Sequence, residues 1–246
     1  MYKIISLIFI LSICFNLVSA EEIPQYDIEI ILFEHKNNTS IDSEVWPLSP
    51  EMPATEGSVS LHRPNAAVYS GSHNNVSGTT PINLTLLTPS DYQMSENIQK
   101  LMTSESYNPL FHVAWRQNVY GNDDAQAIHI TTDRLHPVAA ENETTEQQAK
   151  NATIDGTIVV SLKRFLHLKA DLAYINLDGS NFFSDTETPV VFRMTESRRM
   201  RSKEVHYFDH PKFGMLALIT PYEPPPAPVP APKAMPATQA PVTKTP

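Results

Sequence analysis

Apolar and polar positions alternate along several segments of this chain with the two-residue period of a β-strand. In segment 26–34, Ile28, Ile30 and Leu32 fall on one face of an extended backbone. Ile31 and Phe33 fall on the opposite face. Because a strand with apolar side chains on both faces must be covered on both sides, this segment is predicted to lie at the centre of a sheet. The same pattern predicts further strands at 57–62, 109–119, 127–132, 190–201 and 204–220.

The strongest β pattern runs from residue 154 to residue 177. Within it, the alternation over 158–168 predicts one long, half-buried antiparallel strand, which continues with or turns into 171–177. Arg164 interrupts the apolar face of this strand. Segments 190–201 and 204–220 follow each other closely, so we predict that they form a hairpin with its turn near Ser202–Lys203.

One segment has the period of a helix. Residues 90–106 carry an apolar stripe with a spacing of three to four residues, made of Met94, Ile98, Leu101 and Met102. Ser90 and Gln93 have the spacing of a capping box, which predicts that the helix begins at Ser90. The stripe is typical of a helix that packs on a core.

The remaining segments show neither period. Residues 37–89 are rich in Asn, Ser, Thr, Pro and Gly, which predicts a long polar loop. Residues 223–246 contain nine prolines and no aromatic residue, which predicts a disordered, extended tail that is either a passive spacer or a partner-docking arm. For residues 21–222 we expect one α+β domain, a mainly antiparallel β-sheet with one or more helices packed on it.

The N-terminus has the pattern of a secretory signal peptide. Lys3 precedes an apolar run at 4–18, and a cleavage site of small residues ends at Ala20. We therefore expect 1–20 to be a signal peptide that is cleaved near Ala20, with no membrane insertion afterwards; the alternative is an N-terminal membrane anchor. Cys14, the only cysteine, would be removed with this segment, so no disulfide is expected.

Charge draws attention to one segment. The chain has 18 basic and 27 acidic residues, and an acidic, exported chain is a poor binder of nucleic acid. Segment 193–203 nevertheless holds one acid, Glu196, and five basic residues: Arg193, Arg198, Arg199, Arg201 and Lys203. In a strand, Arg199, Arg201 and Lys203 would share one face. Because guanidinium groups bind carboxylates bidentately, this segment is a candidate ligand site; the alternative is pairing with the protein's own acids.

Two other clusters are candidates for chemistry. Trp115 could stack on a sugar ring while Arg116 hydrogen-bonds to it, or Trp115 packs in the core. His206, Asp209 and His210 are residue types that bind metals, and they define the alternative of a metal-dependent hydrolase.

The segment HYFDHPKFGM that holds these metal-binding residue types also has a structural interpretation. Pro211 disfavours a helical conformation at His210, and in a strand His206 and Asp209 point to opposite faces. We therefore expect a corner of the fold, shaped by Pro211 and Gly214. The chain has no recognised catalytic motif and no glycine-rich phosphate loop, so we expect no enzymatic activity, metal or cofactor.

Four segments carry a family resemblance: YDIEIILFEH, LLTPSDYQMSENIQKLMTSESYNPLFHVAWRQNV, DGTIVVSLKRFLHLKADL and FRMTESRRMRSKEVHYFDHPKFGMLALITPY. In this order they resemble the CsiV family of Gram-negative bacteria. The resemblance implies a periplasmic, non-enzymatic protein that binds peptidoglycan and supports cell-wall assembly and cell shape. It also implies that the protein acts together with a bifunctional penicillin-binding protein and its outer-membrane lipoprotein activator. It assigns no binding residues, and a pure protein–protein adaptor and a cell-wall hydrolase stay as alternatives.

Overall fold

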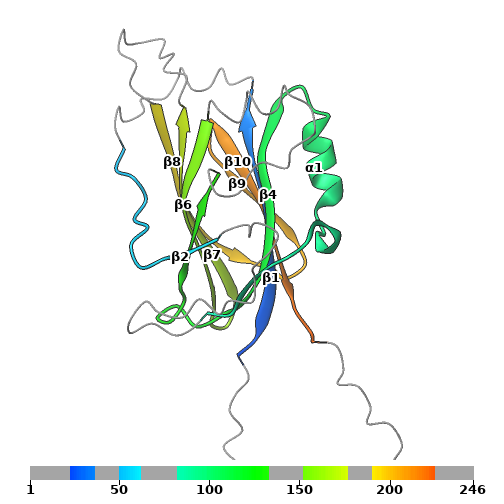
Figure 1. Cartoon of the computed structure of the whole chain (residues 1–246), viewed down its shortest axis with the longest axis vertical. Helices are drawn as coiled ribbons and strands as arrows, with labels where there is room; N and C mark the ends of the chain where they lie inside the picture. The colour runs from blue at the N-terminus through cyan, green and yellow to red at the C-terminus, as the bar shows by residue number, and fades with distance from the viewer. Residues whose placement is uncertain (1–22, 37–49, 62–81, 133–151, 177–189, 225–246) are drawn as a thin grey trace, which may run out of the picture.

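A computed structural model describes residues 23–36, 50–61, 82–132, 152–176 and 190–224. They form two β-sheets that face each other, with one short α-helix on the outer side of one sheet (Figure 1). The predicted α+β fold, dominated by antiparallel strands, is confirmed, and the strands divide between two sheets. The signal peptide expected at 1–20, the tail from residue 225 onwards and most of the polar loop at 37–89 lie outside the described residues.

The first sheet, sheet A, consists of five antiparallel strands. Their spatial order is β3 (Leu84–Leu86), β4 (Tyr107–Asn118), β1 (Gln25–His35), β10 (Phe213–Pro221) and β9 (Val205–Asp209). Strand β1 is central, as its two apolar faces predicted, and its residue Ile30 lies opposite Val113 of β4 and Ala217 of β10. Strand β3 lies within the segment that we expected to be a loop.

The second sheet, sheet B, also has five strands, in the order β2 (Val59–Ser60), β5 (Ala127–Thr131), β6 (Ala152–Leu162), β7 (Leu166–Asn176) and β8 (Val190–Met200). All of its pairs are antiparallel except β2 with β5. The prediction of one long strand over 158–168 is wrong, because the chain turns at 163–165 and Leu162 pairs with Leu166. The charged residue Arg164, which interrupts the apolar face, lies in this turn.

The predicted hairpin between 190–201 and 204–220 is also wrong. Strand β8 ends at Met200 in sheet B, whereas β9 begins at Val205 in sheet A, so residues 201–204 connect the two sheets. Strand β9 forms a hairpin with β10 instead, and Asp209 pairs with Gly214 beside the turn. Alternation along a strand identifies the strand, but it does not identify the partner strand.

The main core lies between the two sheets. It includes Ile28, Ile30 and Leu32 of β1, which meet apolar side chains of sheet B such as Ile158 and Leu168. Removing these side chains from water is the dominant stabilising contribution in a fold of this kind. The opposite face of β1 contributes Ile31 and Phe33 to a second apolar cluster.

Helix α1 (Ser95–Met102) covers this second cluster on the outer face of sheet A (Figure 1). Its buried residues Ile98 and Leu101 belong to the predicted stripe, whereas Met102 is exposed. The helix is shorter than the predicted segment 90–106, because a separate 3-10 turn, Pro89–Asp91, precedes it.

The predicted cap of this helix at Ser90 is wrong. The carboxylate of Glu29, on β1, accepts hydrogen bonds from the backbone N–H groups of Gln93 (2.7 Å) and Met94 (2.9 Å), where α1 begins. Its Oε1 atom also lies 2.6 Å from Nε2 of His112 on β4. The start of the helix is therefore capped from the sheet beneath it, because a buried carboxylate needs donors and a helix start has unused ones.

Candidate functional site

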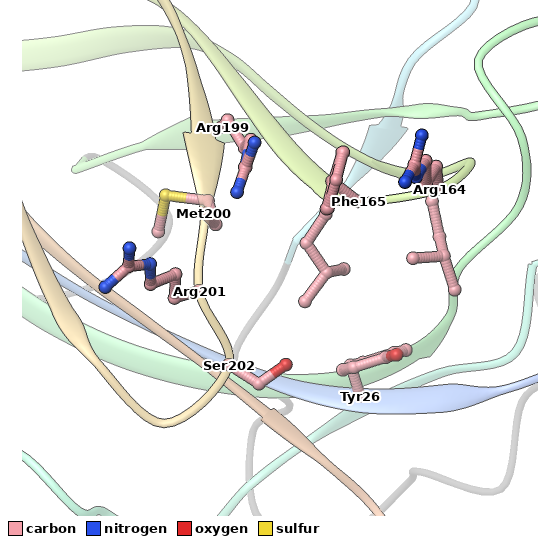
Figure 2. Close-up of a pocket in the computed structure, with 9 residues that line it drawn as sticks. Tyr26, Arg164, Phe165, Arg199, Met200, Arg201 and Ser202 are labelled. Atoms are coloured by element: carbon pink, nitrogen blue, oxygen red, sulfur yellow. The ribbon is translucent and has the colours of Figure 1, made fainter.

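A shallow pocket of about 280 Å³ lies where the basic segment ends. Its lining includes three arginines, Arg164, Arg199 and Arg201, together with Phe165, Met200, Ser202 and Tyr26 (Figure 2). We call this the arginine pocket. Tyr26 comes from sheet A and Met200 from sheet B, so the pocket lies at one end of the space between the sheets. It joins residues that are far apart in the sequence.

Strand pairing explains why these side chains meet. The tight turn 163–165 joins β6 to β7, and β8 pairs with β7 as far as Met200, which lies opposite Leu166. The end of β8 therefore lies beside the turn, with Arg199 opposite His167. Without the turn in the middle of the predicted long strand, Arg164 and Arg199 would not lie close together.

The arginine pocket is strongly cationic. Phe165 lies between Arg199 and Arg164 (Figure 2), and its ring centroid is 3.8 Å from Cζ of Arg199 and 5.4 Å from Cζ of Arg164. Among the described residues, neither of these guanidinium groups forms an ion pair with a carboxylate. Nη1 of Arg201 lies 3.7 Å from Oε1 of Glu204, but the Arg201 side chain is 70% exposed, so solvent screens this pair. Three like charges at one pocket favour an anionic ligand.

The other predicted cations of the segment lie outside the pocket lining. Arg198 is paired with Glu196, and its Nη1 donates a 2.7 Å hydrogen bond to the carbonyl oxygen of Tyr207 on β9. Its guanidinium also lies 5.1 Å from the ring centroid of Phe208. Arg198 thus joins the edge of sheet B to the edge of sheet A. Lys203 is exposed in the connection between the sheets, with a φ of 65°.

The burial of Trp115 argues against the second sequence candidate, a sugar ring stacked on this side chain. Trp115 is fully buried in the core and donates from Nε1 to Oε1 of Gln117 at 2.7 Å, so it has no face open to a sugar. Arg116 donates two hydrogen bonds to Asp27, at 2.7 and 2.9 Å, and lies over the ring of Tyr222. These contacts raise the pKa of Arg116, chiefly through the hydrogen bond to Asp27. Both residues stabilise sheet A.

The whole sequence was also compared with known proteins. It matches the family model described as "Peptidoglycan-binding protein, CsiV" over residues 3–222, which is most of its length. The chain belongs to the CsiV family. Neither the curated proteins nor the solved structures contain a match. Membership of a peptidoglycan-binding family implies the cell envelope, and no enzyme family is indicated. No helix within the described residues is long and apolar enough to cross a membrane.

In this CsiV-family protein the segment HYFDHPKFGM forms the β9–β10 hairpin. Nε2 of His206 accepts a 3.0 Å hydrogen bond from the backbone N–H of Arg201, as expected of a structural residue. Asp209 instead accepts a bond from the Tyr207 hydroxyl, at 2.5 Å. Pro211 lies in the turn, and its carbonyl oxygen accepts a bond from His35.

The third member of the metal hypothesis, His210, is buried. Nδ1 of His210 accepts a hydrogen bond from the backbone N–H of Lys212, and burial lowers its pKa to about 4. Within the described part of the chain, no group of three or more His, Cys, Asp and Glu residues is arranged to hold a metal ion. The geometry therefore gives no support to the metal-dependent hydrolase that uses His206, Asp209 and His210.

The sequence prediction of a ligand site shares two residues with the lining of the arginine pocket. It named Arg199 and Arg201, which line the pocket, but it missed Arg164 and Phe165. The sequence did contain a signal for them. A charged residue such as Arg164 within an apolar face can indicate that the strand ends there, and not only that this position of the strand is exposed. Tyr26 gave no signal, because only the packing of sheet A against sheet B brings it to the pocket.

Proposed function

We propose that this protein is a non-catalytic, periplasmic peptidoglycan-binding protein whose arginine pocket binds the carboxylates of the stem peptides. The supporting observation is the convergence of Arg164, Arg199 and Arg201 on one pocket, together with the absence of carboxylate partners for the first two among the described residues. A guanidinium group binds a carboxylate through two parallel hydrogen bonds, and stem peptides carry free carboxylates.

The neutral part of the lining fits the same ligand class. Phe165 is 38% exposed, and it offers an apolar surface beside the charges for small aliphatic side chains of the peptide. Its contact with Arg199 also holds that guanidinium in place, which reduces the entropy lost on binding. Lys203 lies just beyond the pocket lining, where its charge adds long-range attraction for an anionic polymer.

The biological role that we propose is support of cell-wall assembly and cell shape. In this role the protein binds the polymer and scaffolds a bifunctional penicillin-binding protein with its outer-membrane lipoprotein activator. This part of the proposal follows from the family's implied role. A signal peptide at 1–20 would deliver the chain to the compartment where these partners and the polymer meet.

The test is co-sedimentation of the purified mature protein with isolated sacculi at several salt concentrations. A variant with alanine at Arg164, Arg199 and Arg201 should bind roughly tenfold more weakly, because each exposed charge pair contributes about 0.2–1 kcal/mol. Its remaining binding should also depend less on salt. The matched control removes three exposed positive charges outside the pocket, at Lys36, Lys100 and Lys169.

The control should bind as the wild type does. Equal weakening of both variants would mean that net charge, and not the pocket, attracts the polymer. If the folded arginine variant sediments like the wild type, the pocket is not the site. Sedimentation that requires the penicillin-binding protein or the lipoprotein would make the protein an adaptor, and release of soluble muropeptides by the protein alone would make it a hydrolase.

A further inference from the structure

A cluster of aromatic rings lies at the other end of sheet A, on its outer face. Phe33 and His35 come from β1, Tyr107 from β4 and Tyr207 from β9. The ring centroid of Phe33 is 5.2 Å from that of Tyr107, in an edge-to-face arrangement, and 6.0 Å from that of Tyr207, in a stacked one. The ring of His35 is 5.5 Å from that of Tyr107. We call these four residues the aromatic platform.

The two tyrosines face solvent, although large aromatic side chains are usually covered. Tyr107 is 37% exposed and Tyr207 is 40% exposed, whereas Phe33 beneath them is only 3% exposed. Gly214 on β10 makes this arrangement possible, because a Cβ atom there would lie 2.6 Å from the ring of Phe33 and 2.8 Å from that of Tyr207. The rings therefore lie close against the backbone of the sheet and present an open surface.

Hydrogen-bonding groups surround the rings. The Tyr207 hydroxyl donates to Oδ1 of Asp209 at 2.5 Å, and Nε2 of His35 lies 3.4 Å from the same hydroxyl oxygen. The imidazole is oriented by its Nδ1 atom, which donates to the carbonyl oxygen of Pro211 at 3.1 Å. Burial raises the pKa of Tyr207, and so does its bond to Asp209, so the hydroxyl stays protonated.

We propose that the aromatic platform binds a sugar ring of a peptidoglycan glycan strand. The apolar C–H face of a pyranose ring packs on an aromatic face, and its hydroxyl and amide groups bond to polar groups at the rim. The carboxylate of Asp209 accepts hydrogen bonds from hydroxyl groups but repels an anionic stem peptide, so the platform favours the neutral part of the polymer. This inference rests on the proposed function, and it assigns the glycan and the peptide to different sites.

The distance between the sites fits an extended polymer. Tyr26 lines the arginine pocket, and His35 belongs to the platform. Both lie on β1, nine residues apart, so at about 3.3 Å per residue they are separated by roughly 30 Å along the strand, on opposite faces of sheet A. Tyr207 lies nearer the pocket, because Arg198, the neighbour of Arg199 in the sequence, donates a hydrogen bond to its carbonyl oxygen. Two weak sites on one rigid body bind a polymer more tightly than either does alone, because the second contact is intramolecular. The protein thus recognises assembled peptidoglycan better than its fragments.

The experiment measures binding of soluble N-acetylglucosamine oligomers and of peptide-free glycan strands to the mature protein, by isothermal titration and by the NMR signals of the tyrosine rings. The test variant carries Tyr107→Leu and Tyr207→Leu, which keep an apolar cover over Phe33 but remove the rings. Replacement of both tyrosines by phenylalanine keeps the rings and removes the hydroxyl groups. The matched control is Val205→Ala, at an exposed residue of the same face of β9.

The leucine variant should bind peptide-free glycan about tenfold more weakly, because it loses the contacts of both tyrosine rings with the sugar. The phenylalanine variant should lose less, and the control should match the wild type. Unchanged glycan binding by a leucine variant with a native circular dichroism spectrum would show that the rings serve only to hold the sheet together. If the wild type binds sacculi and stem peptides but not glycan, the platform is refuted and the arginine pocket stands. If it binds neither, the proposed function also fails.

Discussion

The buried carboxylate of Glu29 provides the sharpest test of how this fold is held together. It accepts hydrogen bonds from the backbone N–H groups of Gln93 and Met94 and lies 2.6 Å from Nε2 of His112. Helix α1, which begins at this point, has only eight residues. Because so short a helix is unstable by itself, its position depends on this cap and on its apolar contacts with sheet A.

The magnitude follows from the hydrogen bonds that Glu29→Ala would remove. The variant loses three contacts, at least two of them in buried surroundings, and each unsatisfied buried donor costs about 1–3 kcal/mol. Water can reach the amide of Gln93, which is only partly buried, so we expect a loss of roughly 3–5 kcal/mol in the free energy of unfolding. Glu29→Gln keeps one acceptor oxygen and should lose about 2 kcal/mol.

The assay is urea unfolding, followed by circular dichroism, combined with hydrogen exchange of the amides at the start of α1. The matched control is Glu96→Ala, at an exposed acid in the first turn of the same helix. It should change the free energy of unfolding by less than about 0.5 kcal/mol. If the Glu29 and Glu96 variants unfold at the same urea concentration, the carboxylate does not cap the helix, and apolar packing alone holds it.

Burial lowers the pKa of His210 to about 4, from an ordinary value near 6.5. The unfolded state therefore binds a proton that the folded state excludes, so stability should fall by about 1–3 kcal/mol as the pH drops from 6.5 to 4. Urea unfolding across this range should show the fall in the wild type, and His210→Asn should flatten it; equal slopes would contradict the assignment. At Gly156, a Cβ atom would lie 2.2 Å from the carbonyl oxygen of Asp171 and 2.8 Å from Cα of Leu172. Gly156→Ala should therefore destabilise the fold by more than about 3 kcal/mol in thermal unfolding, whereas Gly121→Ala, with its nearest contact at 3.9 Å, should not.

Local sequence patterns correctly predicted those features that depend on a single strand or helix. The two apolar faces of β1 placed it at the centre of a sheet, and the stripe with Ile98 and Leu101 identified the helix. The basic segment contained Arg199 and Arg201, two cations of the arginine pocket. In each case the period of side chains along one segment follows directly from its backbone geometry, so the sequence carries the information.

Pairing between distant segments was not predictable in the same way. The cap of α1 comes from Glu29, more than sixty residues before the helix, and Arg198 bridges two strands that were expected to form a hairpin but belong to different sheets. The burial of Trp115 was also not predictable. An alternating pattern shows that a strand has two different faces, but it does not show which face lies between two sheets.

The sequence alone therefore determined the central strand β1, the presence of the helix, the family, and the charge of the basic segment. Only the tertiary structure decided which arginines meet at one pocket, which are paired internally, and that Tyr107 and Tyr207 come together on an exposed surface. The physical reason is that secondary structure depends on neighbours along the chain, whereas a binding surface depends on the packing of side chains from strands that are distant in the sequence.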